Sequence, residues 1–485
     1  MLSRFRLKSD YHVLGAILTL AFALRLWGLN APLWFDEIMT LDTHVRLAWG
    51  DMMQTYSTNH HYLFSLQSKL FVTLFGEAPW ALRLPALVFG IGSIAAIWWL
   101  ARDLTDRWTA HITALLLALS FHHIWFSQNA RGYTELAFWS ALGMIFFLNG
   151  LRQPHWKTWL GYALCLWLAV ATHLTGAFFF IAQGLIWLTL AARRLPKDGF
   201  KTPFIIWPTV GYLVGGALIF LFYAPVLTSL FETMGGIRET GEVDVMREYS
   251  NPVWSVIEGV RTAIGSLGPL IGIVAFVALT LIGMGVYALR GRSLIFSITI
   301  ALHILVTLAL LMALGMRVWP RFFFVDIGFL MLLIVLGVRL SVAIFSDHVR
   351  LLSQKTLYAL AVVAMLLVST GLAARNYMAP KQNLIGAYEL AESARDDQTR
   401  IYAVGVAAEL FNGYFDAGWG EILAPDDYDQ ALAEPGPLYL VIAFPARSFR
   451  TVPAMGTDLD DGTLTLAQAF PGTLGDGYVI VLRRD

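Results

Sequence analysis

The sequence has one cysteine, Cys165, which excludes a disulfide framework and any zinc site built from cysteines. It also has little charge: 14% of the residues are charged, against about 25% in ordinary soluble domains. The 34 basic and 34 acidic residues leave no net charge, which argues against a nucleic-acid-binding protein and against an acidic disordered chain. Hydrophobic residues are abundant, at 57% of the chain with a mean hydropathy of +0.62, and they predict a polytopic membrane protein.

Eleven apolar runs are close to the roughly 20 residues that a helix needs to cross a membrane core of about 30 Å. They lie near 11–29, 82–101, 108–126, 133–150, 156–172, 174–192, 204–224, 263–289, 293–315, 319–339 and 355–373. Arg25, near the end of the first run, is expected to snorkel outward. The sequence therefore predicts an α-helical protein with about eleven transmembrane helices.

The distribution of Lys and Arg predicts the orientation of these helices. With the N-terminus inside, the cytoplasmic loops hold sixteen basic residues and five acids, as the positive-inside rule requires. The long segments 30–81, 225–262 and 374–485 then face the external side. We expect a multi-pass protein of the plasma membrane, or of the inner membrane in a bacterium, with its functional site on the external (periplasmic) face.

The composition changes after residue 373, which we take as the boundary between a membrane domain (1–373) and a C-terminal domain (374–485). The C-terminal segment has sixteen acids and eight bases, which fits an external location. Its β-prone runs, Ile401–Val406, Leu438–Phe444 and Tyr478–Leu482, alternate with helix-like and Gly/Pro/Asp-rich pieces. We expect a small external α/β domain.

Two adjacent acids, Asp36 and Glu37, follow the aromatic end of the first predicted helix. A carboxylate at the membrane interface is partly desolvated, which raises its basicity toward that of a general base. The plain alternative is a solvated pair of loop acids. The loop is too long to be a simple connector, which favours a functional role.

The same loop carries adjacent histidines, His60 and His61. Neighbouring residues cannot share one face of a helix, so the pair alone is a poor metal site. Either one histidine joins Asp36 or Glu37 in holding a metal, or the two form hydrogen bonds at the interface. The second interpretation is favoured, and no metal site is expected.

Basic side chains on the external side are candidate contacts for a lipid phosphate, because a guanidinium matches phosphate oxygens with two hydrogen bonds. Arg131 lies in the turn before the fourth span, beside Tyr133 and Glu135. Glu135 is just inside that span, where acids normally face a cavity or a partner, and it is four residues from Arg131. The alternative for Arg131 is snorkelling to the headgroups.

Further candidates of the same kind are Arg321 and Arg317 around a predicted hairpin, with Lys69 as a weaker one. Asp326 lies deeper in the membrane and is expected to pair with either arginine. Residues 225–262, with a Gly-Gly pair beside a charge run, are either a substrate lid or a loop without that role.

Three motifs together resemble the GT-C fold glycosyltransferases. The similarity is to the branch that contains protein O-mannosyltransferases, the lipid A aminoarabinose transferase and bacterial transferases of lipopolysaccharide sugars, and it covers about the first 200 residues. The motifs are Leu33-Trp34-Phe35-Asp36-Glu37-Ile38-Met39-Thr40, Phe75-Gly76-Glu77-Ala78-Pro79-Trp80-Ala81-Leu82-Arg83-Leu84-Pro85 and Ser127-Gln128-Asn129-Ala130-Arg131-Gly132-Tyr133. The chain departs from the family where His60-His61-Tyr62-Leu63 replaces a His-Pro-Pro-Leu-Tyr type run, and where Arg321-Phe322 replaces Arg-Tyr.

The resemblance implies an enzyme that moves a hexosyl or pentosyl group from a polyprenyl-phosphate-sugar donor to a glycan, lipid or protein acceptor. Asp36 would be the catalytic base, with Glu37 assisting by orientation or charge. Arg131 would neutralise the leaving phosphate, and Arg321 and Lys69 would be further donor contacts. The polar groups of His60, His61, Tyr133 and Glu135 would contact substrate.

No cofactor is expected, because the candidate site residues include no DxD motif or His/Asp cluster for a divalent cation, and nucleic acid is not an expected partner. A transporter or flippase for a lipid-linked sugar is the competing class, but the paired halves with broken helices that mark many transporters are not evident. A sensor or scaffold whose external domain does the work is a second alternative, and it would make Asp36 dispensable.

Overall fold

The computed structural model describes residues 2–57, 60–239, 251, 254, 271–348 and 352–485. The chain divides into two compact units. The membrane unit comprises Met1–Leu29, Ala48–Glu239 and the described part of Glu248–Ala374. The sheet unit contains Asn30–Leu47 and Arg375–Asp485. The segment with the two adjacent acids therefore groups with the C-terminal residues, although the sequence places it in a loop of the membrane domain.

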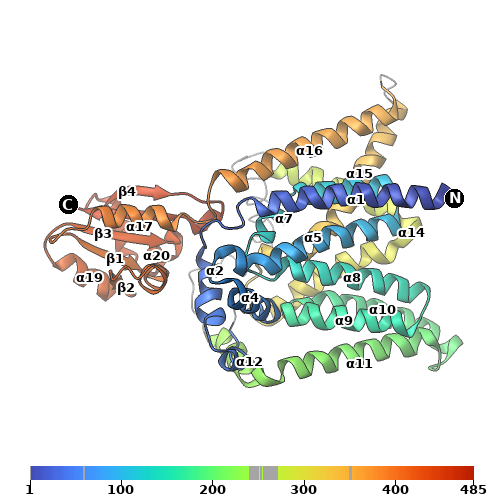
Figure 1. Cartoon of the computed structure of the whole chain (residues 1–485), viewed down its shortest axis with the longest axis horizontal. Helices are drawn as coiled ribbons and strands as arrows, with labels where there is room; N and C mark the ends of the chain where they lie inside the picture. Colours follow the sequence, from blue (N-terminus) through green and yellow to red (C-terminus); the bar gives the residue numbers. More distant parts are fainter. Residues whose placement is uncertain (1, 58–59, 240–250, 252–253, 255–270, 349–351) are drawn as a thin grey trace. The chain divides into compact units, whose positions relative to one another are not determined.

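All regular secondary structure in the described residues of the membrane unit is helical, and Figure 1 shows the long helices α1, α5, α8, α9, α10 and α11 side by side. Its helical segments are α1 (Leu2–Leu26), α3 (Trp49–Met52), α4 (Tyr62–Phe75), α5 (Pro79–Leu104), α6 (Arg107–Leu119), α7 (Phe121–Ser127), α8 (Tyr133–Arg152), α9 (Trp156–Thr172), α10 (Gly176–Asp198), α11 (Pro203–Tyr223), η2 (Ala224–Val226), α12 (Leu227–Glu239), α14 (Ile271–Ala313), η6 (Pro320–Asp326), α15 (Ile327–His348) and α16 (Gln354–Met378).

The predicted spans coincide with helical segments, apart from residues 263–270, which lie outside the described part. Seven of the described helices are long and apolar enough to cross a membrane, or eight if one bent pair is a single span. The 43 residues of α14 would form a helix of about 65 Å, twice the thickness of a membrane core. The helix breaks at Ser293, where φ is −157° and ψ is 82°, between two of the predicted spans. These features support a polytopic membrane fold.

The predicted span 108–126 is not one straight helix. The chain bends by 61° between α6 and α7. Ser120 lies at the bend with an extended backbone, and its Oγ accepts from the backbone N–H of His123 at the start of α7. A serine at this position caps the second helix and satisfies one of its unpaired donors. The bend precedes the turn that carries Arg131.

The helices of the membrane unit pack closely, with α5 on α8, α8 on α9 and α9 on α11. The closest approach is between α14 and α15. A Cβ built on Gly285 would lie 2.0 Å from the carbonyl oxygen of Leu333, and one built on Gly337 would lie 2.0 Å from that of Leu281. Only glycine allows these two backbones to touch, which is a common way of packing membrane helices.

Arg25 is fully buried and does not snorkel, contrary to the expectation from the sequence. Its guanidinium donates to the carbonyl oxygens of Ala21 and Ala118 at 3.0 and 3.1 Å and to Ser127 Oγ at 3.0 Å. Its Nη2 lies 2.7 Å from Nδ1 of His123. Because the bend at Ser120 exposes carbonyl groups at the end of α6, a charged side chain finds its partners inside the bundle. Arg25 thereby joins α1 to the α6–α7 bend.

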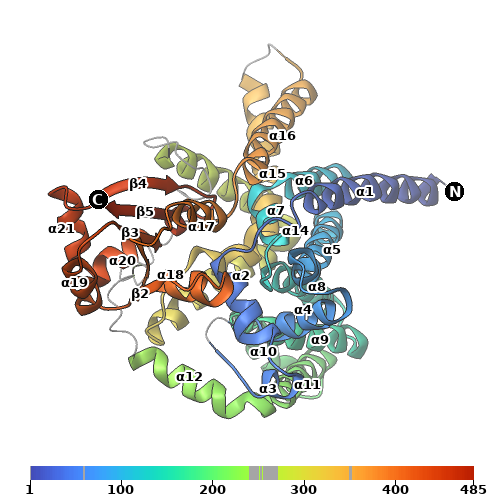
Figure 2. The same cartoon turned by 60° about the vertical axis from the view of Figure 1, so that its left-hand side comes forward.

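The sheet unit is built on five strands in the order β2-β1-β3-β5-β4, of which β3, β4 and β5 can be followed side by side in Figure 2. The strands are β1 (Arg400–Val404), β2 (Gly420–Ile422), β3 (Leu438–Ala443), β4 (Thr465–Phe470) and β5 (Val479–Arg484). β1, β2 and β3 are parallel, with Ala403 opposite Glu421 and Val441, whereas β5 is antiparallel to β3 and to β4. The three strands predicted from the sequence correspond to β1, β3 and β5.

The sequence did not predict strands β2 and β4, because neither has a clear hydrophobic pattern. β2 has only three residues, and β4 is a largely exposed edge strand without a clear run of apolar residues. The connecting helices are α17 (Leu384–Ser393), α18 (Val406–Ala408), η7 (Glu409–Tyr414), α19 (Pro425–Ala433), α20 (Pro445–Thr451), α21 (Ala454–Asp460) and η8 (Gly475–Gly477). Of these, α17 packs on β3, β4 and β5.

The segment Asn30–Leu47 belongs to the sheet unit and folds as α2 (Phe35–Thr40) and η1 (Leu41–Val45). The N–H of Phe35 donates to Oε1 of Gln382 at 3.1 Å. The ring centroids of Phe35 and Phe444 lie 5.3 Å apart in an edge-to-face arrangement. The buried Gln382 also donates to the carbonyl oxygen of Gly477. One glutamine amide thus holds the acid-bearing segment to the sheet.

Candidate functional site

The two adjacent acids of α2 have different surroundings. Glu37 is fully buried: its Oε2 accepts from the N–H of Trp34 at 3.3 Å, and its Oε1 lies 3.5 Å from Nζ of Lys381. Asp36 is half-buried in the same first turn. Since neighbouring residues on a helix point about 100° apart, the two carboxylates do not share a direction. Glu37 therefore holds the turn in place, and Asp36 is the better placed of the two for chemistry.

In the membrane unit, a second group of candidates gathers around His61, which is buried at the start of α4. The backbone N–H of Gly132 donates to Nδ1 of His61 at 3.1 Å. The ring centroid of His61 lies 4.8 Å from that of Tyr133 and 4.4 Å from that of His173. We call these three rings, with Arg131 and Arg321, the basic cluster.

The basic cluster contains one buried and one half-buried arginine beside buried histidines. Arg131 is only 3% exposed. Burial lowers the pKa of His61 well below its usual value, and the charge of Arg131 lowers it further, as does that of Arg321. Burial and the same two arginines lower the pKa of His173 to about 3. Both histidines are therefore neutral at physiological pH.

Because His61 is neutral, only one of its ring nitrogens carries a proton, and a hydrogen bond from Gly132 identifies which one. Nδ1 accepts the hydrogen bond from Gly132, so the proton is on Nε2. This Nε2 is buried and has no hydrogen-bond partner among the described residues. A buried donor without a partner is rare in native proteins, and it is typical of a site that awaits a ligand.

Glu135 is fully buried near the start of α8. Its Oε1 accepts from Nε2 of Gln67 at 2.9 Å and from Nε1 of Trp139 at 3.2 Å. Gln67 lies on α4, so Glu135 links α4 to α8. These neutral partners satisfy Oε1, whereas the buried Oε2 has no hydrogen-bond partner among the described residues.

The remaining candidates of the first loop are His60, which directly precedes His61, and Lys69 on α4. His60 is buried, with its ring 5.1 Å from that of Tyr62 and 5.8 Å from that of Tyr56. Nζ of Lys69 lies 5.1 Å from the centre of the Trp49 ring, which is a cation–π distance. Neither residue appears in the ring contacts that define the basic cluster.

Sequence reasoning missed His173 and the partner of Asp326, both in the membrane unit. His173 lies in the turn between α9 and α10, and an ionisable residue between two apolar runs is itself a signal. Asp326 pairs with His303 of α14, with Nδ1 2.9 Å from Oδ2, and not with Arg317 or Arg321 as expected. Both residues of this pair are buried, and Asp326 ends the short helix η6 that carries Arg321. The pair therefore fixes the element from which that arginine extends.

The candidates are thus distributed over both units. Asp36 and Glu37 belong to the sheet unit, and all the other predicted site residues belong to the membrane unit. Among the described residues, no group of three or more His, Cys, Asp or Glu side chains could hold a metal ion.

Residues 59–228 match the family model described as dolichyl-phosphate-mannose-protein mannosyltransferase. The match covers a third of the chain and includes the basic cluster except for Arg321. No curated protein matches the chain.

Solved structures with a similar fold include ArnT from Cupriavidus metallidurans in the apo state, with a TM-score of 0.50 and 13% identity over 99% of this chain and 98% of that one. Another is the archaeal oligosaccharyltransferase AglB from Archaeoglobus fulgidus in complex with an inhibitory peptide and a dolichol-phosphate. Its TM-score is 0.54 and its identity 12%, over 93% of this chain and 72% of that one. At these identities the likeness is one of fold. Together with the family match, it confirms the resemblance to GT-C fold glycosyltransferases.

Proposed function

We propose that this polytopic GT-C fold glycosyltransferase moves a sugar from a polyprenyl-phosphate donor to a hydroxyl group of a glycan, lipid or protein acceptor. The transfer takes place on the external face of the plasma membrane, or in a bacterium on the periplasmic face of the inner membrane. It inverts the anomeric configuration, because the acceptor displaces the lipid phosphate in one step. Asp36 is the general base.

The basic cluster is the observation that carries the proposal. Arg131 and Arg321 both act on the same two buried histidines, so their charges converge on one place. A guanidinium binds phosphate oxygens through two hydrogen bonds, and a buried site strengthens that attraction. The N–H at Nε2 of His61 adds a neutral donor. This chemistry fits a lipid phosphate, the class of compound that the AglB complex contains.

Each residue of the proposed site has a separate role in the reaction. Asp36 removes the proton as the acceptor oxygen attacks the anomeric carbon, and the bond from that carbon to the phosphate oxygen breaks. Negative charge then grows on the leaving phosphate, where Arg131 and Arg321 neutralise it. Glu37 orients the turn that carries Asp36, because its carboxylate binds the Trp34 N–H and faces Lys381. His60, Tyr133, Glu135 and Lys69 are proposed as further substrate contacts.

The first test measures transfer by full-length protein in nanodiscs that contain a radiolabelled polyprenyl-phosphate sugar and envelope extract as acceptor. D36N is expected to abolish transfer while the protein still folds and inserts. D42N, in the same segment, is the matched control and is expected to keep activity. Full activity of D36N would contradict the proposal.

The same assay separates the donor site from the base. R131M is expected to weaken donor binding and transfer together, whereas R152M, whose side chain pairs with Asp103 on the surface, is expected to behave like the wild type. A flippase would move the donor across the bilayer without making a new glycosidic bond, so the product also distinguishes the competing class. Mass spectrometry of surface glycolipids and glycoproteins from a deletion strain identifies the acceptor.

A further inference from the structure

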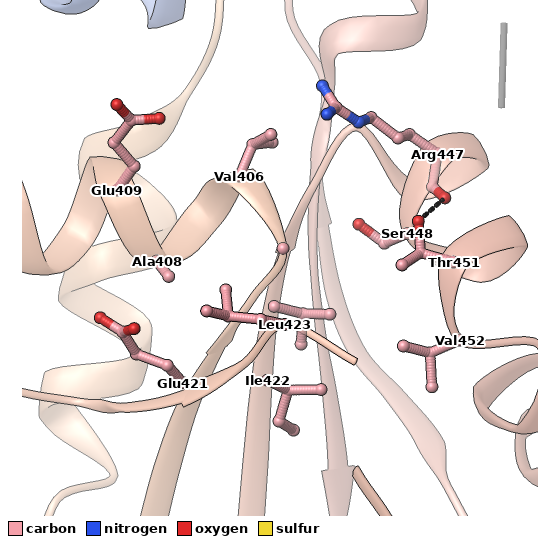
Figure 3. Close-up of a pocket in the computed structure, with 12 residues that line it drawn as sticks. Val406, Ala408, Glu409, Glu421, Ile422, Leu423, Arg447, Ser448, Thr451 and Val452 are labelled. Carbon is pink, nitrogen blue, oxygen red and sulfur yellow. Dashed lines mark hydrogen bonds between the residues drawn. The ribbon is translucent and has the colours of Figure 1, made fainter. Parts of the chain in front are cut away.

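A cavity of about 410 Å³ opens in the sheet unit, at the carboxyl ends of β1 and β2 and beside α20 (Figure 3). Its volume falls in the range of about 300 to 1,000 Å³ that small-molecule sites occupy. All of its lining residues belong to the sheet unit. It shares no residue with the basic cluster.

The topology of the sheet places this cavity at a point where ligands bind in many α/β folds. From β1 the chain continues to β2 on one side, whereas from β3 it continues to β4 and β5 on the other side. Such a reversal between neighbouring parallel strands opens a crevice at their carboxyl ends. β1 and β3 leave the sheet through residues with positive φ, Gly405 at 59° and Phe444 at 53°, so the chain turns sharply at both strand ends.

Three charged side chains line the cavity. Figure 3 shows Glu409 and Glu421 on one side and Arg447 on the other. Partial burial and the nearby Asp42 raise the pKa of Glu409, and Arg447 lowers it. Oε1 of Glu421 accepts from Nδ2 of Asn412 at 2.9 Å, which fixes its direction and leaves its second oxygen for another donor.

The rest of the lining supplies hydroxyl groups and apolar surface. The hydroxyl of Thr451 donates to the carbonyl oxygen of Arg447 at 3.2 Å, as the dashed line in Figure 3 marks. Val406, Leu423 and Val452 contribute aliphatic surface, and the described residues that line the cavity include no aromatic ring. The lining therefore combines strong acceptors, a forked donor and a non-aromatic apolar face.

We propose that this pocket binds a saccharide that carries no acidic group, as a site distinct from the one that handles the lipid-linked donor. A carboxylate accepts hydrogen bonds from neighbouring hydroxyls, and a guanidinium donates to a further pair of oxygens. Aliphatic side chains fit the C–H surface of a pyranose ring. Polyhydroxylated rings need both acceptors and donors around an apolar face, and the pocket offers all three.

The charge of the pocket excludes other ligand classes. Among the described lining residues, two carboxylates stand against one guanidinium, and this excess of negative charge disfavours anions such as phosphates, nucleotides and uronic acids. A divalent cation would need more oxygen ligands and no neighbouring guanidinium. Flat aromatic ligands would lack a ring to stack on. A neutral sugar or an amino sugar remains.

The test measures binding of methyl glycosides to full-length protein in nanodiscs without lipid-linked donor, by saturation-transfer difference NMR. The probes are the methyl glycosides of mannose, glucose, glucosamine and glucuronic acid. We expect binding of at least one of the first three, and weaker binding of glucuronate. E409Q and R447M are expected to raise the Kd about tenfold or more, because each weakens a charge-assisted hydrogen bond.

Matched controls are E389Q on α17 and R450M on α20, which change the same charges outside the pocket and are expected to leave the Kd unchanged. If E409Q or R447M fails to fold, T451V removes only one hydroxyl and is expected to raise the Kd severalfold. The proposal is overturned if the wild type binds none of the three sugars, if it prefers glucuronate, or if folded pocket variants bind like the wild type.

Discussion

Gly132 donates its backbone N–H to Nδ1 of His61 at 3.1 Å, and this one bond joins two segments that are 71 residues apart. It fixes the tautomer of a buried, neutral histidine, and it places the turn that carries Arg131 against the start of α4. The fold thereby builds a neutral donor and a buried cation next to each other.

The first prediction concerns the space around Gly132. A Cβ at this position would lie 2.5 Å from Cγ2 of the fully buried Thr172 and 3.1 Å from Nδ1 of His61. Because neither side chain has room to move, we expect G132A to lower the free energy of unfolding by about 1 to 3 kcal/mol and to reduce transfer strongly. Thermal unfolding and the nanodisc assay measure the two effects. G216A, where a Cβ meets nothing within 4 Å, is the control; equal behaviour of both variants would contradict the prediction.

The second prediction concerns pH. An unfolded histidine binds a proton near pH 6.5, whereas folded His173 binds one only near pH 3 and His61 only well below its usual pKa. The unfolded state therefore holds more protons between these values, and stability is lost as the pH falls below about 6.5. Each histidine adds a slope of up to about 1.4 kcal/mol per pH unit.

Thermal unfolding between pH 7.5 and 5 checks this expectation. H173N is expected to flatten the dependence, since Asn keeps an acceptor for the Thr175 N–H that now donates to His173 Nδ1 at 3.2 Å. H155N, at an exposed helix cap, is expected to leave the slope as it is. A slope in H173N as steep as in the wild type would show that His173 is not held neutral.

The third prediction concerns Glu37 and Lys381 of the sheet unit. K381M removes the cation that faces the fully buried Glu37 carboxylate, and the carboxylate then lacks a compensating charge. We expect this variant to lose about 3 kcal/mol of stability. E37Q/K381M is expected to recover most of it, because a neutral amide needs no cation. A double-mutant cycle gives the coupling energy. The more exposed pair Glu392 and Arg395 serves as the control, with a coupling of about 0.5 kcal/mol, and additive effects of E37Q and K381M would refute the prediction.

The fourth prediction concerns His303 and Asp326. H303L removes the hydrogen-bond partner that Asp326 has among the described residues, so we expect the free energy of unfolding to fall by about 3 to 5 kcal/mol. D326N keeps the hydrogen bond and is expected to lower the stability much less. H303L/D326L is expected to fold better than H303L. Since Asp326 ends the helix that carries Arg321, the folded double variant is expected to show a higher KM for the lipid-linked donor with a smaller change in kcat. An unchanged KM would separate the pair from donor binding.

Local patterns were sufficient to predict most of the secondary structure. Apolar runs of membrane length mark α5, α8 and α11, and β-prone runs mark β1, β3 and β5, because the hydrophobic effect acts on each segment through its own composition. The motif around Arg131 and the acids at 36 and 37 were also evident, since their residue types and spacing lie within short stretches. The resemblance to GT-C fold glycosyltransferases followed from three such stretches.

The partners of individual polar groups could not be predicted in this way. Arg25 donates to acceptors near residues 117–127, and the Phe35 N–H donates to Gln382. Asp326 pairs with His303, although two arginines are nearer to it in the sequence. In a membrane, a polar group must be satisfied by whatever the neighbouring helices present at its depth. The bend at Ser120 and the order of the strands determine those neighbours.

The sequence by itself therefore determined that this is a helical membrane protein with a sheet-forming C-terminal segment and an acid pair after its first helix. Only the tertiary structure decided that Glu37 is buried as a positioning group, that His61 is neutral with its proton on Nε2, and that a charged cavity opens where β1 and β2 end. Composition and periodicity act within a segment. Burial, protonation and cavities arise where segments distant in the sequence come together.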